Sequence, residues 1–352
     1  YGYDEKTGTY YYQAQDGGPL RTGVYKCDAK GKVTSISTEP GQNSAIFSGN
    51  FKQLIITHHS AATPHTYTLR NDKGKVQKTL QDNAALKQKI DGMNLAKIEF
   101  FQFQTQDGVD LNGIMVKPAD FDANKKYPVI LYQYSGPGSQ QVLDSWYAGN
   151  CSAALLERYM AQEGFVSVIV DGRGTGGRGA EFEKQTYLKL GQLESHDQVE
   201  TAIYLSKLPW VDAKHIGIWG WSFGGFNTLM SMSEGRPVFY AGVAVAPPTS
   251  WRYYDTVYTE RFMRTPKENQ EGYDCSPITR AKNLSGSLLI IHGLADDNVH
   301  FRNVAEYTEA LVHADKDFRQ LTYTNRNHSI YGGNTRNHLF RQLINHFKQS
   351  MK

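Results

Sequence analysis

The chain contains the stretch His215-Ile216-Gly217-Ile218-Trp219-Gly220-Trp221-Ser222-Phe223-Gly224-Gly225. Its first half is apolar enough for a buried strand, and the residues from Phe226 onward can begin a helix. The G-x-S-x-G pattern lies at the junction, where a sharp turn needs glycine on both sides of the serine because larger side chains would collide with the strand and the helix. We therefore expect Ser222 to be a nucleophile at a strand-to-helix turn, where helix N–H groups favour the negative charge that develops during a reaction.

Outward from this turn, buried strand patterns alternate with amphipathic helical patterns. The strand patterns span residues 128–132, 165–170, 215–219, 242–246, 288–291 and 320–324. The helical patterns span residues 153–162, 196–208, 226–232, 304–313 and 338–351. Strands separated by helices in this way form a mostly parallel sheet that is covered on both faces. Together with the serine turn, this alternation predicts the α/β class and an α/β-hydrolase fold with a doubly wound sheet.

An α/β-hydrolase carries its acid after a later strand and its histidine later still. The strand pattern at 288–291 leads into a loop that contains Asp296, and the pattern at 320–324 leads into His328. His328 would take the proton of Ser222 as a general base, while Asp296 would hold the imidazole in the required tautomer and stabilise its protonated form. The sequence thus predicts the triad Ser222, Asp296 and His328.

Neighbouring residues are rivals for two of these positions. Asp297 follows Asp296 directly, so spacing alone gives Asp296 only a modest advantage. His292 lies at the end of a strand pattern and His300 lies just beyond the acid loop. Neither histidine therefore occupies the late position that is expected of the base.

Residues 9–80 have a different pattern, with short strands rich in Tyr, Thr, Ile and Val between turn residues. Lys30-Gly31-Lys32-Val33 recurs 43 residues later as Lys73-Gly74-Lys75-Val76, an offset in the range of a propeller blade. Chance recurrence of a short turn is the alternative. Because two blades do not close a ring, we expect antiparallel strands from the end of a β-propeller in residues 1–85, a catalytic domain in residues 86–352, and a chain that begins inside a larger protein.

Composition argues against several classes of protein. The 38 basic and 35 acidic residues are interleaved, without the basic runs that would follow a phosphate backbone, so we expect no nucleic-acid partner. Apolar stretches such as 165–170 are too short to span a bilayer. The three cysteines, Cys27, Cys151 and Cys275, match no zinc spacing, and an odd number excludes a fully paired disulfide framework. We expect the chemistry to need neither a metal nor a cofactor.

At these motifs the sequence resembles the prolyl oligopeptidase family, and within it the dipeptidyl peptidase IV branch. The similar stretches are Gly220-Trp221-Ser222-Phe223-Gly224-Gly225 (with Phe where Tyr is common), residues 292–301 around the acid, residues 251–261, Tyr134-Ser135-Gly136-Pro137 and Asp171-Gly172-Arg173-Gly174. The likeness is strong over about residues 95–352 and weaker before them. The resemblance assigns the acid role to the first aspartate, Asp296.

The resemblance implies further roles that spacing does not provide. Tyr134 matches the position whose hydroxyl completes an oxyanion hole with the backbone N–H of Phe223, so that two donors point at the oxygen that becomes negative. The lining of a small apolar pocket for proline matches Phe223, Trp251, Tyr254, Tyr258 and Val299. Asn298 matches a side chain that hydrogen-bonds a substrate carbonyl. For the aromatic residues alone, ordinary core packing is the alternative.

The resemblance also implies a function, which is a serine peptidase that releases N-terminal dipeptides after proline or alanine through an acyl-enzyme. It further implies a homodimer and a periplasmic, secreted or cell-surface location. In this branch a pair of glutamates in the propeller holds the free amino group of the substrate. No glutamate pair occurs before residue 95, so we expect that pair upstream of residue 1.

Other motifs and classes of protein provide alternatives to this function. Residues 172–177 satisfy a G-x-G-x-x-G dinucleotide pattern after a strand, but no suitable acidic residue follows a second strand, which favours a structural loop. A catalytically silent hydrolase fold could serve as an interaction module, although Ser, Asp and His are all present. Within the enzyme class, the alternatives are an oligopeptidase or acyl-aminoacyl peptidase, which would favour N-blocked substrates, and an esterase for small acyl substrates.

Overall fold

The computed structural model describes residues 1–149 and 152–351, and it divides into two compact units. One unit comprises Tyr1–Ile98 and Val142–Tyr159, and the other comprises Glu99–Gln141 and Met160–Lys352. Val142–Tyr159 therefore groups in space with the N-terminal strands, although the sequence places it in the predicted catalytic domain. The domain boundary between residues 85 and 86 stays a prediction, and Cys151 lies outside the described residues.

The first unit consists of two four-stranded antiparallel sheets, with strand orders β1-β2-β3-β4 and β5-β6-β7-β8. The strands are β1 (Gly2–Asp4), β2 (Thr9–Gln15), β3 (Thr22–Cys27), β4 (Val33–Ser37), β5 (Gln42–Phe47), β6 (Gln53–Ser60), β7 (Thr63–Asn71) and β8 (Val76–Gln81), and α1 (Ala84–Asp91) follows them. The recurring Lys-Gly-Lys-Val falls at the same turn of each sheet, before its fourth strand. Gly31 and Gly74 both have positive φ there, at 82° and 81°. The recurrence thus marks equivalent turns in two blade-like sheets, which confirms the predicted antiparallel region.

The segment Val142–Tyr159 is tied to this unit by side-chain hydrogen bonds. Asp144 accepts hydrogen bonds from Arg21 Nε at 3.0 Å and from the backbone N–H of Ala61 at 3.1 Å. His59 Nδ1 accepts from the backbone N–H of Trp146 at 3.1 Å. Contacts between residues this far apart in sequence could not be inferred from strand and helix patterns.

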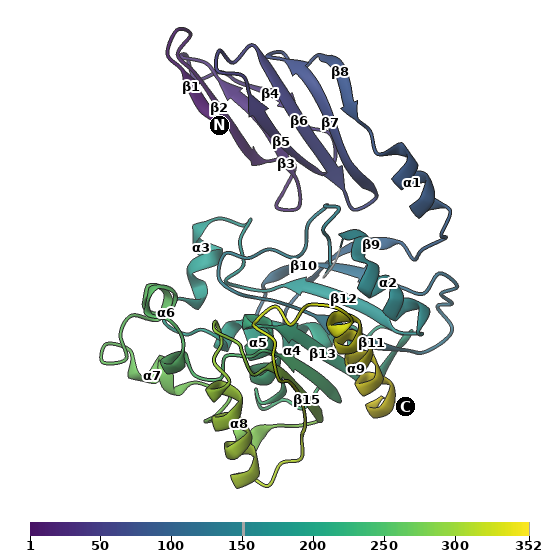
Figure 1. Cartoon of the computed structure of the whole chain (residues 1–352), viewed down its shortest axis with the longest axis vertical. Helices are drawn as coiled ribbons and strands as arrows, with labels where there is room; N and C mark the ends of the chain where they lie inside the picture. The colour runs from purple at the N-terminus through teal and green to yellow at the C-terminus, as the bar shows by residue number, and fades with distance from the viewer. Residues whose placement is uncertain (150–151, 352) are drawn as a thin grey trace. The chain divides into compact units, whose positions relative to one another are not determined.

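The second unit is built on an eight-stranded sheet of order β16-β15-β14-β13-β11-β12-β10-β9 (Figure 1). Its strands are β9 (Ile98–Gln104), β10 (Asp110–Val116), β11 (Tyr127–Tyr132), β12 (Val166–Asp171), β13 (Val211–Trp221), β14 (Ala241–Val245), β15 (Ser287–Gly293) and β16 (Arg319–Tyr323). Neighbours from β12 to β16 are parallel, and β10 pairs with β12 in the antiparallel sense. Each of the six predicted strand patterns overlaps one of the parallel strands, so the predicted fold class is confirmed.

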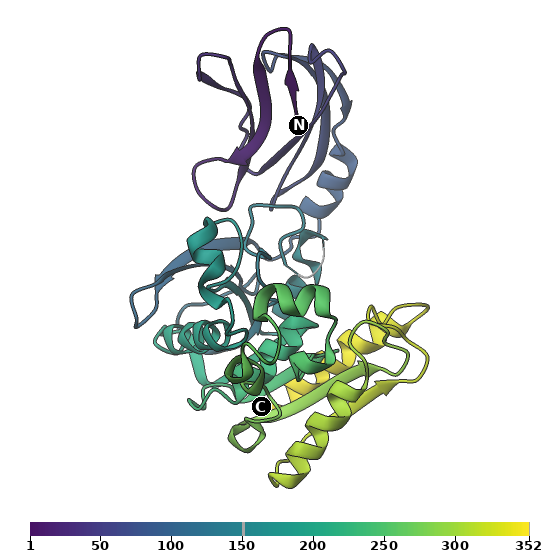
Figure 2. The same cartoon turned by 90° about the vertical axis from the view of Figure 1, so that its left-hand side faces the viewer.

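Helices cover both faces of this sheet (Figure 2). The helices from residue 155 onward are α2 (Leu155–Gln162), α3 (Ala180–Glu183), α4 (Gln192–Ser206), α5 (Phe223–Met232), α6 (Thr256–Met263), α7 (Gln270–Asp274), α8 (Arg302–His313) and α9 (Thr335–Ser350), of which α2 begins in the first unit. Two glycines show how closely the helices approach. A side chain on Gly242 would overlap Met232 of α5, whereas a Cβ on Gly217 would lie 2.6 Å from Phe347 of α9. Since Gly242 pairs with Ile218, the residue after Gly217, these two helices lie on opposite faces.

Within the described ranges, none of the helices combines the length and the apolar character that crossing a bilayer requires. The same ranges contain no cluster of three or more His, Cys, Asp or Glu side chains placed to hold a metal ion.

Candidate active site

Ser222 lies in the turn between β13 and α5, where the sequence predicts it. Its backbone has φ 59° and ψ −119°, a conformation that residues other than glycine rarely adopt. A side chain on Gly224 would overlap the carbonyl oxygen of Gln133, and a Cβ on Gly220 would lie 2.6 Å from the same oxygen. The strained turn therefore depends on both glycines of the pattern, and it holds Ser222 at the N-terminus of a helix.

Asp296 and His328 follow the carboxyl ends of β15 and β16, and a hydrogen bond joins them. His328 Nδ1 lies 2.7 Å from Asp296 Oδ2. The other carboxylate oxygen, Oδ1, accepts hydrogen bonds from the backbone N–H groups of Asn298 at 3.0 Å and Val299 at 2.8 Å. These contacts fix the carboxylate, and they hold the histidine with Nδ1 as donor and Nε2 as the nitrogen that can accept a proton.

The environment of Asp296 keeps its carboxyl ionised. Burial by itself raises the pKa of Asp296, but the hydrogen bond and charge of His328 and the two backbone N–H donors outweigh burial and leave the pKa below its ordinary value. At neutral pH the carboxylate is therefore available to stabilise a positive charge on the imidazole of His328.

The rival residues have other surroundings. Asp297 and His300 are exposed. His292 is fully buried, and burial lowers its pKa. Its Nε2 lies 2.8 Å from the carbonyl oxygen of Val299, which a neutral imidazole satisfies by donating its proton. The geometry therefore favours Asp296 over Asp297 as the partner of His328 and gives His292 a structural role in the acid loop.

The nucleophile turn and the histidine loop are joined through Trp221, whose indole Nε1 donates to the carbonyl oxygen of His328 at 3.0 Å. In the described part of the chain, no hydrogen bond connects the hydroxyl of Ser222 to the ring of His328. Such bonds are often long in ligand-free enzymes and shorten when substrate binds. The role of Ser222 as the nucleophile thus stays a prediction that its turn and its neighbours support.

The rings of Tyr134 and Phe223 lie close together, and the oxyanion hole that the resemblance implies for these residues stays a prediction. Tyr134 lies two residues beyond the end of β11, and its ring centroid is 6.1 Å from that of Phe223. Burial, and to a lesser extent the phenol of Tyr254, raise the pKa of Tyr134, so its hydroxyl keeps its proton and can donate. Phe223 is the first residue of α5, where backbone N–H groups have no partner within the helix.

Six rings form an aromatic cluster beside this turn. Its members are Phe223, Phe226, Trp251, Tyr254, Tyr258 and Phe262. Neighbouring rings have centroids 4.9 to 5.9 Å apart. Trp251 is buried, whereas Tyr254 and Tyr258 are half-buried and can present a ring face to a ligand. The structure therefore brings together four of the predicted pocket residues and adds Phe226 and Phe262, which sequence reasoning missed.

The other two predicted binding residues lie in the acid loop. Asn298 Oδ1 accepts a hydrogen bond from the hydroxyl of Tyr254 at 3.0 Å, so it borders the aromatic cluster. Val299 is fully buried, and its N–H donates to Asp296. Among the described residues, the core contacts of the aromatic cluster do not include Val299. Its role in the pocket wall stays a prediction.

The G-x-G-x-x-G segment after β12 is held by carboxylates of the protein itself. Arg173 is buried and donates to Asp197 at 2.5 Å and to Asp107 at 2.8 Å. The backbone N–H of Gln141 donates to both carboxylate oxygens of Asp171, at 2.9 and 3.1 Å. These bonds fit a structural loop, which is the interpretation favoured by the sequence.

Glu194 is a buried carboxyl that sequence reasoning missed. It lies in the first turn of α4, and its Oε2 accepts a hydrogen bond from the N–H of Gly191 at 2.8 Å. Gly191 packs against the ring of Phe226, where a Cβ would lie 2.5 Å from Cζ. Burial raises the pKa of Glu194 to about 8 despite its backbone hydrogen bonds, so the carboxyl is protonated at neutral pH beneath the aromatic cluster.

We expect the stability of Glu194→Gln relative to wild type to be higher at pH 8 than at pH 5. In wild type the unfolded chain releases the Glu194 proton near pH 4.5 and the folded chain near pH 8, so stability falls as pH rises between these values. Glutamine does not titrate, and the melting temperature of the variant relative to wild type should rise by about 4 °C or more over that interval. Melting curves at both pH values provide the measurement, with exposed Glu181→Gln as control. An equal difference at both pH values would contradict the assignment.

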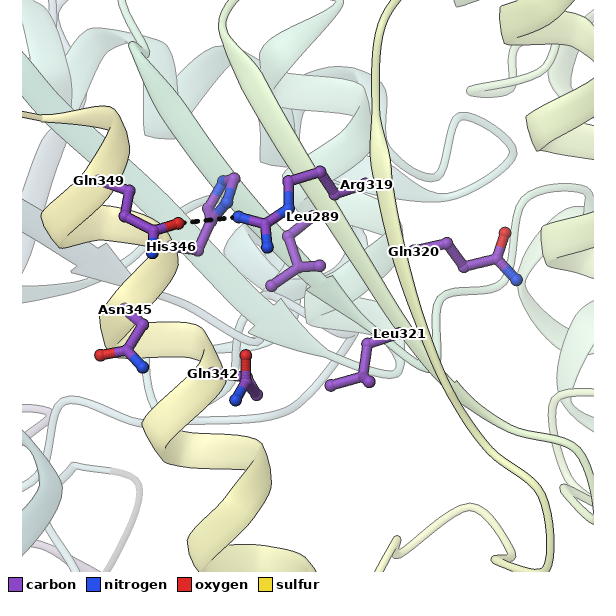
Figure 3. Close-up of a pocket in the computed structure, with 8 residues that line it drawn as sticks. All are labelled: Leu289, Arg319, Gln320, Leu321, Gln342, Asn345, His346 and Gln349. Atoms are coloured by element: carbon purple, nitrogen blue, oxygen red, sulfur yellow. Dashed lines mark hydrogen bonds between the residues drawn. The ribbon is translucent and has the colours of Figure 1, made fainter.

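A hollow of about 120 Å³ lies between β15, β16 and α9 (Figure 3). Figure 3 shows a hydrogen bond that joins Arg319 and Gln349, which line the hollow. Arg319 Nη1 donates to Gln349 Oε1 at 2.9 Å. Leu289 and Arg319 line the hollow near the beginnings of their strands, whereas Asp296 and His328 follow the ends of the same strands. Because the strands are parallel, the hollow lies at the edge opposite to the candidate active site.

Comparisons with known proteins agree with the resemblance that the motifs carry. The profile of the prolyl oligopeptidase family matches residues 153–352, and the profile of the dipeptidyl peptidase IV (DPP IV) N-terminal region matches residues 1–65. The second match covers the antiparallel strands from β1 to β6 and the first residues of β7.

Several relatives are similar over most of the chain. The crystal structure of Porphyromonas gingivalis dipeptidyl peptidase 4 has a TM-score of 0.94 and 48% sequence identity, and the match covers 99% of this chain and 49% of that one. The protein named "Probable dipeptidyl peptidase 4" from Aspergillus flavus is 37% identical over 311 residues, which are 85% of this chain and 39% of the relative. Dipeptidyl peptidase 4 from Arthroderma otae is 36% identical over 313 residues, with shares of 87% and 40%.

The chain spans less than half the length of each of these relatives. The family profile nevertheless matches more than half of its residues, and it includes Ser222, Asp296 and His328. The chain belongs to the prolyl oligopeptidase family.

Proposed function

We propose that the full-length protein is a serine peptidase that removes N-terminal dipeptides whose second residue is proline or alanine. The observation that carries this proposal is the 2.7 Å contact between Asp296 and His328 in loops beside the Ser222 turn. Ser222 Oγ forms a bond to the carbonyl carbon of the second residue while His328 takes the hydroxyl proton. The carbon–nitrogen bond then breaks as His328 passes that proton to the leaving amine, and water hydrolyses the acyl-enzyme.

Two further features support a peptide substrate with proline. The hydroxyl of Tyr134 and the N–H of Phe223 can donate to the oxygen that becomes negative in the tetrahedral intermediate. The aromatic cluster offers flat apolar walls to a ring-shaped side chain, and Asn298 borders it as a group that can bind a substrate carbonyl.

The proposal can be tested with the full-length protein and a Gly-Pro chromogenic substrate, offered with a free amino group and as its N-blocked twin. We expect only the free substrate to be cleaved, because a dipeptidyl peptidase must bind the amino group of its substrate. Ser222→Ala should cleave neither. Cleavage of the blocked substrate at an equal or higher rate would point to an oligopeptidase or acyl-aminoacyl peptidase, and it would overturn the exopeptidase assignment while leaving the triad in place.

In relatives of this branch a glutamate pair binds the free amino group of the substrate, and no such pair occurs before residue 95. The remaining proposals rest on the family resemblance. We propose a homodimer, which size-exclusion chromatography of the full-length protein can check, and a periplasmic, secreted or cell-surface location, which cell fractionation can check.

A further inference from the structure

Gln133 has a buried side-chain amide that links the chain segments of the two candidate oxyanion donors. It follows the last residue of β11 directly and precedes Tyr134, and its exposed fraction is 0%. Its Nε2 donates to the carbonyl oxygen of Gly224 at 2.7 Å and to Thr228 Oγ1 at 3.2 Å. Both partners belong to α5, the helix that begins with Phe223. The side chain therefore links the end of one strand to the helix that follows the nucleophile.

The acceptor side of the same amide is also occupied. Gln133 Oε1 accepts hydrogen bonds from Asn227 Nδ2 at 3.1 Å and from Ser135 Oγ at 2.9 Å. With two donors and two acceptor sites used, the amide has one orientation that satisfies all of its bonds. A buried amide held in this way is rigid, because any rotation leaves a polar group without a partner.

The turn that contains Tyr134 depends on one of these bonds. Ser135 has φ 64°, in the left-handed region that is uncommon for residues other than glycine. Its hydroxyl bonds to Gln133, and Gln198 Nε2 lies 3.5 Å from the same hydroxyl. The backbone of Gln133 contributes too, because its carbonyl oxygen leaves no room for a side chain on Gly220 or Gly224. The two turns are thus packed together through a single residue.

We propose that Gln133 is a positioning residue that sets the separation of the Tyr134 hydroxyl and the Phe223 N–H. This inference rests on the proposed function in one respect, namely that these two groups are the oxyanion donors. Each donor must lie within about 2.7–3.1 Å of the oxygen that becomes negative, and the chain segment of each donor is fixed to Gln133. A shift of about 1 Å in such a group lowers a rate by about 100-fold.

The test uses Gln133→Met, which keeps the length of the side chain and removes its four hydrogen bonds. In the full-length protein we expect kcat for the free Gly-Pro substrate to fall by about 10- to 100-fold, with KM within about twofold of wild type. In a Tyr134→Phe background the same substitution should cost no more than about threefold, because the separation of the two donors no longer matters when one of them is absent. This loss of effect is the readout that a merely structural role would not give.

Two further variants separate positioning from folding. Val129 lies earlier on β11 and is fully buried in the core around the eight-stranded sheet, so Val129→Ala should leave kcat within about twofold in both backgrounds. Ser135→Ala removes the 2.9 Å bond to Gln133 Oε1 together with the 3.5 Å contact to Gln198 Nε2. It should lower kcat by about 3- to 10-fold, again only when Tyr134 is present, and it keeps the test available if Gln133→Met does not fold.

The rate at which a fluorophosphonate probe labels Ser222 provides a second measurement that needs no peptide substrate. If wild type does not cleave Gly-Pro substrates, the proposed function fails. The positioning role is still supported if Gln133→Met is labelled more slowly than wild type and if this difference is absent in the Tyr134→Phe background. Two results would overturn the inference. One is a double variant whose fold-loss in kcat equals the product of the losses of Gln133→Met and Tyr134→Phe. The other is a Gln133→Met enzyme whose kcat and labelling rate match wild type.

Discussion

Replacing Ser222 with alanine should lower kcat for the free Gly-Pro substrate by about 10⁶-fold, the size of effect that removal of a catalytic serine has in serine peptidases. Without its hydroxyl no acyl-enzyme forms, and the remaining rate comes from binding and from oxyanion stabilisation alone. The fold should persist, because alanine keeps the Cβ of serine and adopts the same positive φ of 59° at equal cost.

The control for this variant is Ser233→Ala, at the other end of α5. Ser233 is fully buried, and its hydroxyl donates to the carbonyl oxygen of Leu229 at 2.7 Å. Its replacement should change kcat by less than about twofold while lowering stability by about 1 kcal/mol. If Ser222→Ala instead retained a few per cent of the activity after active-site titration had excluded contamination, the nucleophile would be another residue.

Asp296→Asn should lower kcat by about 10⁴-fold, as loss of the orienting carboxylate does in serine peptidases. The geometry explains the size of the effect. The backbone N–H groups of Asn298 and Val299 require an oxygen at the Oδ1 position, so the new amide must turn its NH₂ toward His328. An NH₂ group there cannot accept a hydrogen bond from Nδ1, which forces the imidazole into the tautomer that carries its proton on Nε2. That tautomer cannot take a proton from Ser222.

Asp297→Asn is the matched control, since it makes the same chemical change at the next position on an exposed side chain. We expect its kcat to stay within about twofold of wild type. Steady-state rates on active-site-titrated enzyme compare the two variants directly. A larger loss for Asp297→Asn than for Asp296→Asn would transfer the acid role to the neighbour and would show that the hydrogen bond to His328 is not the one used in catalysis.

Helix boundaries show where sequence patterns stop being sufficient. The pattern predicts the helix after the nucleophile from residue 226, because Gly224 and Gly225 disfavour helices, yet α5 begins at Phe223. The glycines are tolerated since the carbonyl oxygen of Gln133 approaches Gly224 too closely for any side chain. Likewise α4 begins at Gln192 instead of residue 196, because the carboxyl of Glu194 bonds to the N–H of Gly191 and extends the helix by a turn.

Sequence patterns do not predict the short helices around the aromatic cluster. α6 and α7 are eight and five residues long, too short for a reliable hydrophobic period. Their starts are instead marked by side chains that accept hydrogen bonds from backbone N–H groups, Asp255 for α6 and Asn269 for α7. Attention to these capping residues could have found both helices.

The sequence alone determined the fold class, the family and the order in which candidate catalytic residues enter the sheet. These properties depend on local information: the period of apolar residues, the glycines on either side of Ser222, and the positions of Asp296 and His328 after successive strands. Only the tertiary structure showed the hydrogen bond between Asp296 and His328, the grouping of Val142–Tyr159 with the N-terminal strands, and the link that Gln133 makes between the Tyr134 turn and α5. Each of these depends on distances between segments far apart in the chain, and packing sets such distances while sequence spacing does not.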